Sequence, residues 1–249
     1  IGFYAPRSHN IINLDTCLIQ DKIADKVADI TRNWMKKYNI SAASIDGVFN
    51  KNGLIRHIMI RKGFTTNEVM VVLVSTREKI EYIDKFIELI KDNVEGIKSI
   101  ILNVNKENTN VILGQENINL YGDGSIKDIL GEYIFKISPL SFYQVNPVQA
   151  EALYNYAIEA AEITKDDIVF DLYCGIGTIS IFMANSAKEV YGVEIVEQAI
   201  DMAKENAEFN EVKNTHFIAG DTEIVLTDLI EKQHIMPDVI IVDPPRKGL

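Results

Sequence analysis

The chain has 249 residues, a formal net charge of −11 and a hydrophobic content of 47%. This length suffices for one large or two ordinary domains with apolar cores. The acidic balance excludes a global basic field of the kind that attracts nucleic acids, and so counts weakly against an RNA partner, because local basic patches can coexist with an acidic total.

The two cysteines, Cys17 and Cys174, are far apart and lack the spacing of metal ligands. Such usage is typical of a reducing, cytoplasmic environment rather than of a disulfide scaffold. No signal peptide is present, and no apolar run approaches the roughly 18 residues that span a membrane. The start at Ile1 and the stop at Leu249, directly after a D-P-P-R-K-G-L motif, indicate a fragment of a longer protein.

The first half predicts an α/β domain over residues 1–137. Residues 1–20 are expected to form loop and strand. Helical periodicity over 21–38, with Asp21 as the cap, predicts one helix, and residues 79–93 predict a second. The strands predicted between and after these helices cover 43–49, 56–62, 68–75, 97–104, 111–113, 118–121 and 133–137.

The second half, residues 138–249, alternates strictly between strands and helices after a first helix at 150–161. Such alternation predicts right-handed βαβ units and a doubly wound, Rossmann-like parallel sheet, incomplete at its C-terminus. Ligands bind such sheets outside the carboxyl ends of the strands. The predicted elements are, in order, 168–172, 179–187, 189–193, 197–210, 215–219, 223–231 and 238–242.

The glycine loop F-D-L-Y-C-G-I-G-T, residues 170–178, follows the first of these strands. Gly175 and Gly177 allow the backbone to approach a ligand closely. A dinucleotide fingerprint would need a third glycine where Ser180 stands, and no lysine is placed as in a phosphate-binding P-loop. With Glu194 ending the next strand, the pattern favours a ligand with an adenosine but no pyrophosphate, such as S-adenosylmethionine.

Carboxylates mark four strand ends, at Asp171, Glu194, Asp221 and Asp243. Glu194 is suited to accept two hydrogen bonds from a ribose diol, and Asp221 could hold the adenine amino group. Tyr173 could stack on the ligand or pack in the fold. Asp171 could contact the ligand or brace the glycine loop through its N–H groups. For Glu194, the alternative is an exposed strand-end carboxylate without a ligand.

Two prolines after Asp243 predict a rigid, extended exit from the last strand, which would fix this carboxylate over the pocket. A purely structural Pro-Pro turn is the alternative. Methylases that act on exocyclic amines carry N-P-P-Y here, so the Asp of D-P-P-R favours another target atom, such as a ring carbon.

At this point the sequence resembles a known family. The runs ISPLSFYQVNPVQAEALY, FDLYCGIGTISI, GVEIVEQAI, AKENAEFN and VDPPRKGL are similar to those of RNA (uracil-5-)-methyltransferases over most of residues 132–249. GFYAPRSHNIINLDTCLIQ is more loosely similar to the ribosomal-RNA members. The resemblance implies S-adenosylmethionine as cofactor and RNA as substrate, with the first domain facing the RNA. It places cofactor contacts on Gln144, Tyr173, Glu194 and Asp243, and also on Thr178 and Asp221. Gly175 and Gly177 of the glycine loop complete the predicted cofactor-binding residues.

The chain also departs from that family. The resemblance implies a nucleophilic cysteine and a glutamate base downstream of Leu249, and an RNA-binding barrel before Ile1. Cys174 is expected to be a small loop residue. Cys17 matches the fourth ligand of the [4Fe-4S] cluster that many members hold, but one cysteine cannot hold a cluster.

C5 of uracil is a poor nucleophile, so a full-length enzyme needs thiolate addition at C6 and a base that removes the C5 proton. The resemblance leads us to expect an S-adenosylmethionine-dependent methyltransferase that acts on uridine C5 in 23S ribosomal RNA, and a monomer. The fragment alone is expected to be inactive. The alternatives are a transfer-RNA T-loop uridine, another RNA or DNA base, or a non-catalytic RNA-binding module. Ser180 disfavours a dinucleotide oxidoreductase.

Overall fold

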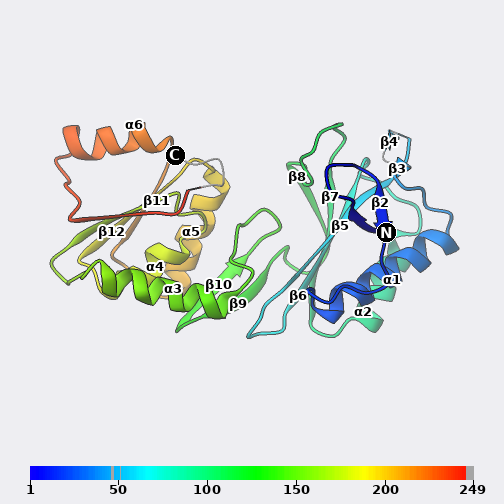
Figure 1. Ribbon diagram of the computed structural model, residues 1–249, viewed down its shortest axis with the longest axis horizontal. Helices are drawn as coiled ribbons and strands as arrows, with labels where there is room; N and C mark the ends of the chain where they lie inside the picture. Colours follow the sequence, from blue (N-terminus) through cyan, green and yellow to red (C-terminus); the bar gives the residue numbers. More distant parts are fainter. Residues whose placement is uncertain (46–47, 51, 245–249) are drawn as a thin grey trace. The chain divides into compact units, whose positions relative to one another are not determined.

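The structure is a computed structural model that describes residues 1–45, 48–50 and 52–244. It divides into two compact units, coloured from blue to green and from green to red in Figure 1. The first comprises Ile1–Gly63 and Asn67–Ile126, and the second comprises Phe64–Thr66 and Lys127–Leu249. Each unit has its own four-stranded sheet. Among the described residues, no helix combines the length and the apolar character that a membrane crossing requires.

The sheet of the first unit has the order β5-β6-β7-β8, with β6 and β7 parallel and the outer pairs antiparallel. The strands are β5 (Ile55–Lys62), β6 (Val69–Ser75), β7 (Ile97–Val104) and β8 (Glu116–Tyr121). Every residue of β6 is buried, as the unbroken apolar run V-M-V-V-L-V requires. The helices α1 (Lys22–Lys37) and α2 (Ile83–Asn93) pack against this sheet through Trp34 and Phe86.

Two small hairpins complete the first unit. One consists of β1 (Gly2–Tyr4) and β2 (Ile11–Asn13), and the other of β3 (Ser44–Ile45) and β4 (Val48–Phe49). Asp21 caps α1, as predicted, by accepting a hydrogen bond from the Ile23 N–H. Helix α2 begins at Ile83 rather than at 79, because Tyr82 has a left-handed backbone with φ of 57°.

The strand predicted at 111–113 is wrong. This segment is a loop whose backbone groups bond to side chains instead of to a neighbouring strand. The Asn105 amide donates to the carbonyls of Val111 and Ile112, and the Asn103 side chain accepts from the Gly114 N–H. Asparagine side chains that replace ladder hydrogen bonds in this way favour turns over strands.

The second unit contains a fully parallel sheet of order β13-β12-β11-β14, which confirms the predicted Rossmann-like fold. Its strands are β11 (Ile168–Leu172), β12 (Glu189–Glu194), β13 (Thr215–Ala219) and β14 (Val239–Val242). The helices are α3 (Pro147–Ala160), α4 (Thr178–Ala184), α5 (Glu197–Phe209) and α6 (Thr222–Thr227), and α6 continues as a π-helical turn at Asp228–Lys232.

Helices cover both faces of this sheet (Figure 1). Val169 of β11 packs with residues of α4, whereas Phe170 and Leu172 pack with Val225 and Leu229 on the α6 side. This alternation is the period of two that a strand imposes on its side chains. Asp171 therefore shares a face with Val169 and points toward α4.

A hairpin of β9 (Ile126–Leu130) and β10 (Tyr133–Ile137) packs with the second unit. Asn206 of α5 accepts from the Lys136 N–H, and Asn210 accepts from the Ile134 N–H, both at 2.8 Å. The units therefore divide between Ile126 and Lys127, and not at the 137/138 boundary expected from the sequence. The buried carboxylate of Asp128 likewise binds the N–H groups of Phe64 and Thr65, each at 2.9 Å.

Phe86→Ala is expected to lower the free energy of unfolding of the first unit by about 3–5 kcal/mol, because it empties a fully buried site. Trp34, the single tryptophan, packs against Phe86 with ring centroids 5.0 Å apart, so its fluorescence during urea denaturation reports on this core. Glu88→Ala, on the exposed face of the same helix, should change stability by less than about 0.5 kcal/mol. Equal effects of the two substitutions would contradict the packing described.

Candidate cofactor site

The glycine loop joins β11 to α4, and its two glycines serve different purposes. Both have a left-handed backbone, with φ of 54° at Gly175 and 80° at Gly177. A Cβ on Gly177 would lie 2.8 Å from Cζ of Phe217, so close packing requires this glycine. A Cβ on Gly175 would have no atom within 4 Å, so the loop borders open space at this residue. Gly175 is therefore where a ligand can approach the backbone.

Glu194, the last residue of β12, is bonded directly to this loop. Its Oε2 accepts from the Gly175 N–H at 3.2 Å, and its Oε1 accepts from the Val196 N–H at 3.0 Å. Each carboxylate oxygen can accept a second hydrogen bond. Glu194 thus combines a fixed orientation with free capacity for a diol.

Asp171 lies fully buried beneath the loop, where its Oδ2 accepts from the Ser180 hydroxyl at 2.5 Å. Its Oδ1 is buried with no hydrogen-bond partner among the described residues. Burial raises the pKa of Asp171 to about 7, and the nearby charges of Asp243 and Glu194 add to this rise. The bond to Ser180 ties Asp171 to the first turn of α4 through a hydroxyl. Ligand contact and bracing of the loop through its N–H groups, the two roles left open by the sequence, stay predictions.

Tyr154, near Gln144 and Thr178, is a site residue that the sequence pattern did not indicate. The hydroxyl of Tyr154, on α3, lies near enough to the side chains of Thr178 and Gln144 for each of them to lower its pKa. Burial raises the pKa of Tyr154, and the charges of Asp243 and Asp171 also raise it. Tyr154 therefore lies at the same site as the predicted residues. It is the last residue of the run ISPLSFYQVNPVQAEALY, which could have drawn attention to it.

The structure places the remaining predicted residues as follows. Tyr173 is half-buried in the loop with φ of 67°, a strained conformation that tyrosine rarely adopts and that clusters at functional sites. Asp221 caps α6, because its Oδ1 accepts from the N–H groups of Glu223 and Ile224. Asp243 is exposed directly after β14. Pro245 and Arg246 of the D-P-P-R motif lie outside the described residues.

The two cysteines have different surroundings. The Cys174 side chain is 5% exposed, and burial strongly raises the pKa of its thiol, so it remains protonated and packs inside the loop. Cys17 is a half-buried free cysteine in the first unit. Within the described parts of the chain, no three His, Cys, Asp or Glu side chains lie together as metal ligands would. The cluster role of Cys17 stays a prediction.

The family model of the tRNA (uracil-5-)-methyltransferases matches residues 48–249. The chain belongs to this family. Its relatives include RNA methyltransferases of uncharacterised specificity from Clostridium tetani, 50% identical, and Clostridium acetobutylicum, 48% identical. Each alignment covers 100% of this chain and 53% of the relative, so the chain spans about half the length of these curated relatives.

Among solved structures, the chain is similar to the tRNA (uracil-54, C5)-methyltransferase of Pyrococcus abyssi, determined in complex with S-adenosyl-L-homocysteine. The two share 26% sequence identity and a TM-score of 0.74, over 96% of this chain and 55% of the other. The fold described above, from both units, is therefore one that an RNA-methylating enzyme uses.

Asp171→Asn is expected to change how stability depends on pH. The folded-state pKa of about 7 lies above the ordinary value of 3.8, so the stability contributed by neutral Asp171 is full below pH 3.8 and is lost as pH rises toward 7. An asparagine at this position cannot ionise, so the variant does not lose this stability as the pH rises. The melting temperature of the variant minus that of the wild type, followed by circular dichroism, should therefore increase between about pH 5 and pH 8. A difference independent of pH would show that Asp171 is not held protonated by its surroundings.

Proposed function

We propose that the chain carries the S-adenosylmethionine site of an enzyme that methylates C5 of a uridine in RNA. The observation that carries the cofactor part is the open space at Gly175, bordered by the Glu194 carboxylate that bonds to the loop itself. An adenosine ribose there would donate its two hydroxyls to Glu194, the residue type that this position requires.

The charge of the site fits a cationic ligand. Asp243 and Glu194 lie close enough to Asp171 to raise its pKa, so three carboxylates share the ends of the parallel strands. Like charges gathered in this way repel, and a positive group among them relieves the repulsion. S-adenosylmethionine carries a sulfonium and an ammonium. A pyrophosphate would add negative charge, which argues against a dinucleotide.

Among the predicted contacts, Gln144, Tyr173 and Thr178 would bind or flank this cofactor, with Tyr154 near Gln144 and Thr178. The Oδ1 of Asp221 already accepts two hydrogen bonds at the start of α6, so its second oxygen is the one that remains for the adenine amino group. Bound cofactor would supply the methyl group, and the residues of this chain hold and orient it. In the Pyrococcus abyssi relative, the corresponding family fold binds S-adenosyl-L-homocysteine.

The proposal that the methyl group goes to uridine C5 rests on family membership and on Asp243. The D-P-P-R motif of this residue differs from the N-P-P-Y motif of amine methylases. Methylation at C5 needs a thiolate nucleophile, and Cys174 is buried and protonated. We propose that the nucleophile and the base belong to the part of the relatives' length that this chain does not span. The 249 residues should then bind cofactor without methylating RNA.

Two RNA substrates are compatible with the family. The segment GFYAPRSHNIINLDTCLIQ, similar to ribosomal-RNA members, favours 23S ribosomal RNA. The family description and the Pyrococcus abyssi relative name transfer RNA, which makes a T-loop uridine the second candidate. A non-catalytic RNA-binding module on the same fold is the alternative from another functional class.

Glu194→Gln is expected to weaken S-adenosylmethionine binding about 10- to 100-fold, because hydrogen bonds to a charged acceptor are worth about 1.5–3 kcal/mol. Isothermal titration calorimetry on the 249-residue chain measures this. Glu189→Gln, at the other end of the same strand, is the matched control and should bind like the wild type. Equal affinity of the Glu194→Gln variant and the wild type for S-adenosylmethionine would contradict the proposal that Glu194 binds the cofactor.

Deletion of the full-length gene is expected to remove 5-methyluridine from 23S ribosomal RNA and to leave the T-loop methyluridine in place. Mass spectrometric mapping of both RNAs from the deletion strain measures this. Loss from transfer RNA instead would establish the second candidate, and an unchanged pattern in both RNAs would refute uridine methylation.

A further inference from the structure

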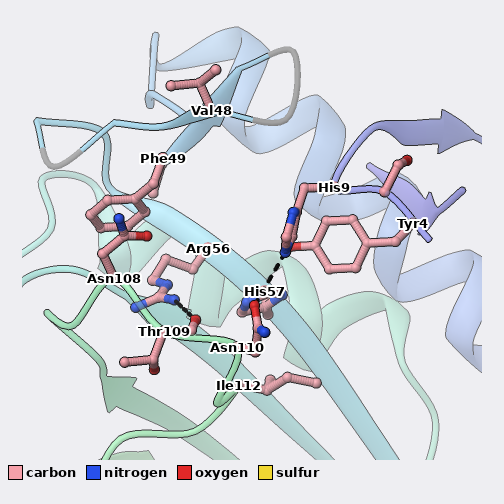
Figure 2. A pocket seen from close by; sticks show the side chains of 12 residues that line it. Tyr4, His9, Val48, Phe49, Arg56, His57, Asn108, Thr109, Asn110 and Ile112 are labelled. Carbon is pink, nitrogen blue, oxygen red and sulfur yellow. Dashed lines mark hydrogen bonds between the residues drawn. The ribbon is translucent and has the colours of Figure 1, made fainter.

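The first unit contains a cavity of about 590 Å³ that the cofactor site does not explain. It lies among β1, the turn that follows it, β4, β5 and the loop after β7 (Figure 2). Its volume falls within the roughly 300–1,000 Å³ typical of small-molecule sites. Its lining combines aromatic and polar residues with three aliphatic ones, Ala43, Val48 and Ile112.

One side of the cavity is a cluster of three rings. Tyr4 meets His9 edge to face at a centroid distance of 5.7 Å, and meets His57 in the same manner at 6.2 Å. The His9 ring is fixed by a hydrogen bond between its Nε2 and Oδ1 of Asn110, 3.1 Å apart. Figure 2 shows the Tyr4 ring beside His9, with His57 and Asn110 next to them. These contacts hold Tyr4 in place although its side chain is 44% exposed.

The other side carries a fixed positive charge. The Arg56 guanidinium lies over the Phe49 ring, 5.1 Å from its centroid. It donates hydrogen bonds to backbone carbonyls of the loop after β7, those of Asn105, Glu107 and Thr109. Carbonyl oxygens orient a guanidinium without neutralising it, so its charge remains available to an anion.

The electrostatics of this cavity differ from those of the whole chain. None of the described residues that line it is acidic, although the chain has 36 acidic against 25 basic residues. Burial and the charge of Arg56 lower the pKa of His57 to about 4. Its ring is therefore neutral at physiological pH and offers one donor and one acceptor.

The cavity holds the groups that bind an unpaired nucleotide: exposed aromatic rings, a neutral imidazole, side-chain amides and a fixed cation. The base stacks on a ring, its edge forms hydrogen bonds, and its phosphate approaches the cation. We propose that this cavity binds one unpaired nucleotide of an RNA chain, with the base on Tyr4 and the phosphate toward Arg56. The identification of the ligand as RNA rests on the proposed function, whereas the site itself lies wholly in the first unit.

The test is fluorescence anisotropy of the 249-residue chain with fluorescein-labelled tetra-uridylate and tetra-adenylate, without cofactor. Tyr4→Ala should weaken binding about tenfold, the effect of losing one base–aromatic stack. Phe3→Ala is the matched control, because Phe3 is equally exposed, at 45%, and is the neighbour of Tyr4 on β1, where alternate residues face opposite sides. It should bind within twofold of the wild type. Circular dichroism confirms that both variants fold.

Competition distinguishes nucleotide binding from phosphate binding. Uridine 5′-monophosphate should displace the labelled RNA, and ribose 5-phosphate should not. Displacement by both alike would make this a phosphate site and overturn the proposal, as would equal effects of Tyr4→Ala and Phe3→Ala, or no binding of either tetranucleotide. Cofactor titration of the same proteins separates the two proposals, because Tyr4→Ala should leave S-adenosylmethionine affinity unchanged.

Discussion

The hydrogen bond from the Gly175 N–H to the Glu194 carboxylate joins the glycine loop to the next strand of the parallel sheet. Most of the cofactor site depends on this bond, because it holds both the glycine loop and the carboxylate that would accept the ribose diol in position. The bond is possible only because β11 and β12 are parallel neighbours whose carboxyl ends lie side by side. Gly192 of β12 leaves room for the loop residue Cys174 to pack against this strand. A Cβ on Gly192 would lie 2.7 Å from Phe217 and 3.0 Å from the Cys174 sulfur.

The site holds its carboxylates at a cost to stability. Asp171 is fully buried with one unpaired oxygen, and Glu194 and Asp243 add negative charge around it. Burying a charge without a partner is unfavourable, so Asp171 takes up a proton more readily than an exposed carboxyl does. A bound cation would favour its ionised form. The same arrangement lowers the stability of the fold and would strengthen the binding of a sulfonium.

Local periodicity made much of this fold predictable. The strand–helix alternation, the Asp21 cap and the turn at Gly175 and Gly177 each depend on residues close in sequence, and the structure contains all of them. The side-chain amides of Asn206 and Asn210 bind β10 across some 70 residues, and no local pattern reveals such bonds. For the same reason the place of the β9–β10 hairpin differs from expectation. The loop at 111–113 differs for another reason, because the nearby side chains of Asn103 and Asn105 bond to backbone groups of this segment and the loop around it.

In the site, too, residues indicated by a local sequence pattern were predictable, and residues brought in by tertiary packing were not. Residue types at strand ends indicated Glu194 and Asp171, and the structure brings them together at the loop. Tyr154 comes from a helix that precedes the sheet, so its approach to Gln144 and Thr178 depends on how α3 packs. Asp221 caps α6. A carboxylate at a strand end can either cap the next helix or bind a ligand, and the sequence pattern alone does not distinguish these roles.

The central claim is that the open side of Gly175 is an S-adenosylmethionine site. A crystal structure of the 249-residue chain with S-adenosyl-L-homocysteine tests it most directly. The account predicts both ribose hydroxyls on the Glu194 carboxylate, the adenosine against the glycine loop, and the sulfur on the side of Asp171 and Asp243. A ligand bound elsewhere, or one bound without contact to Glu194, would contradict it.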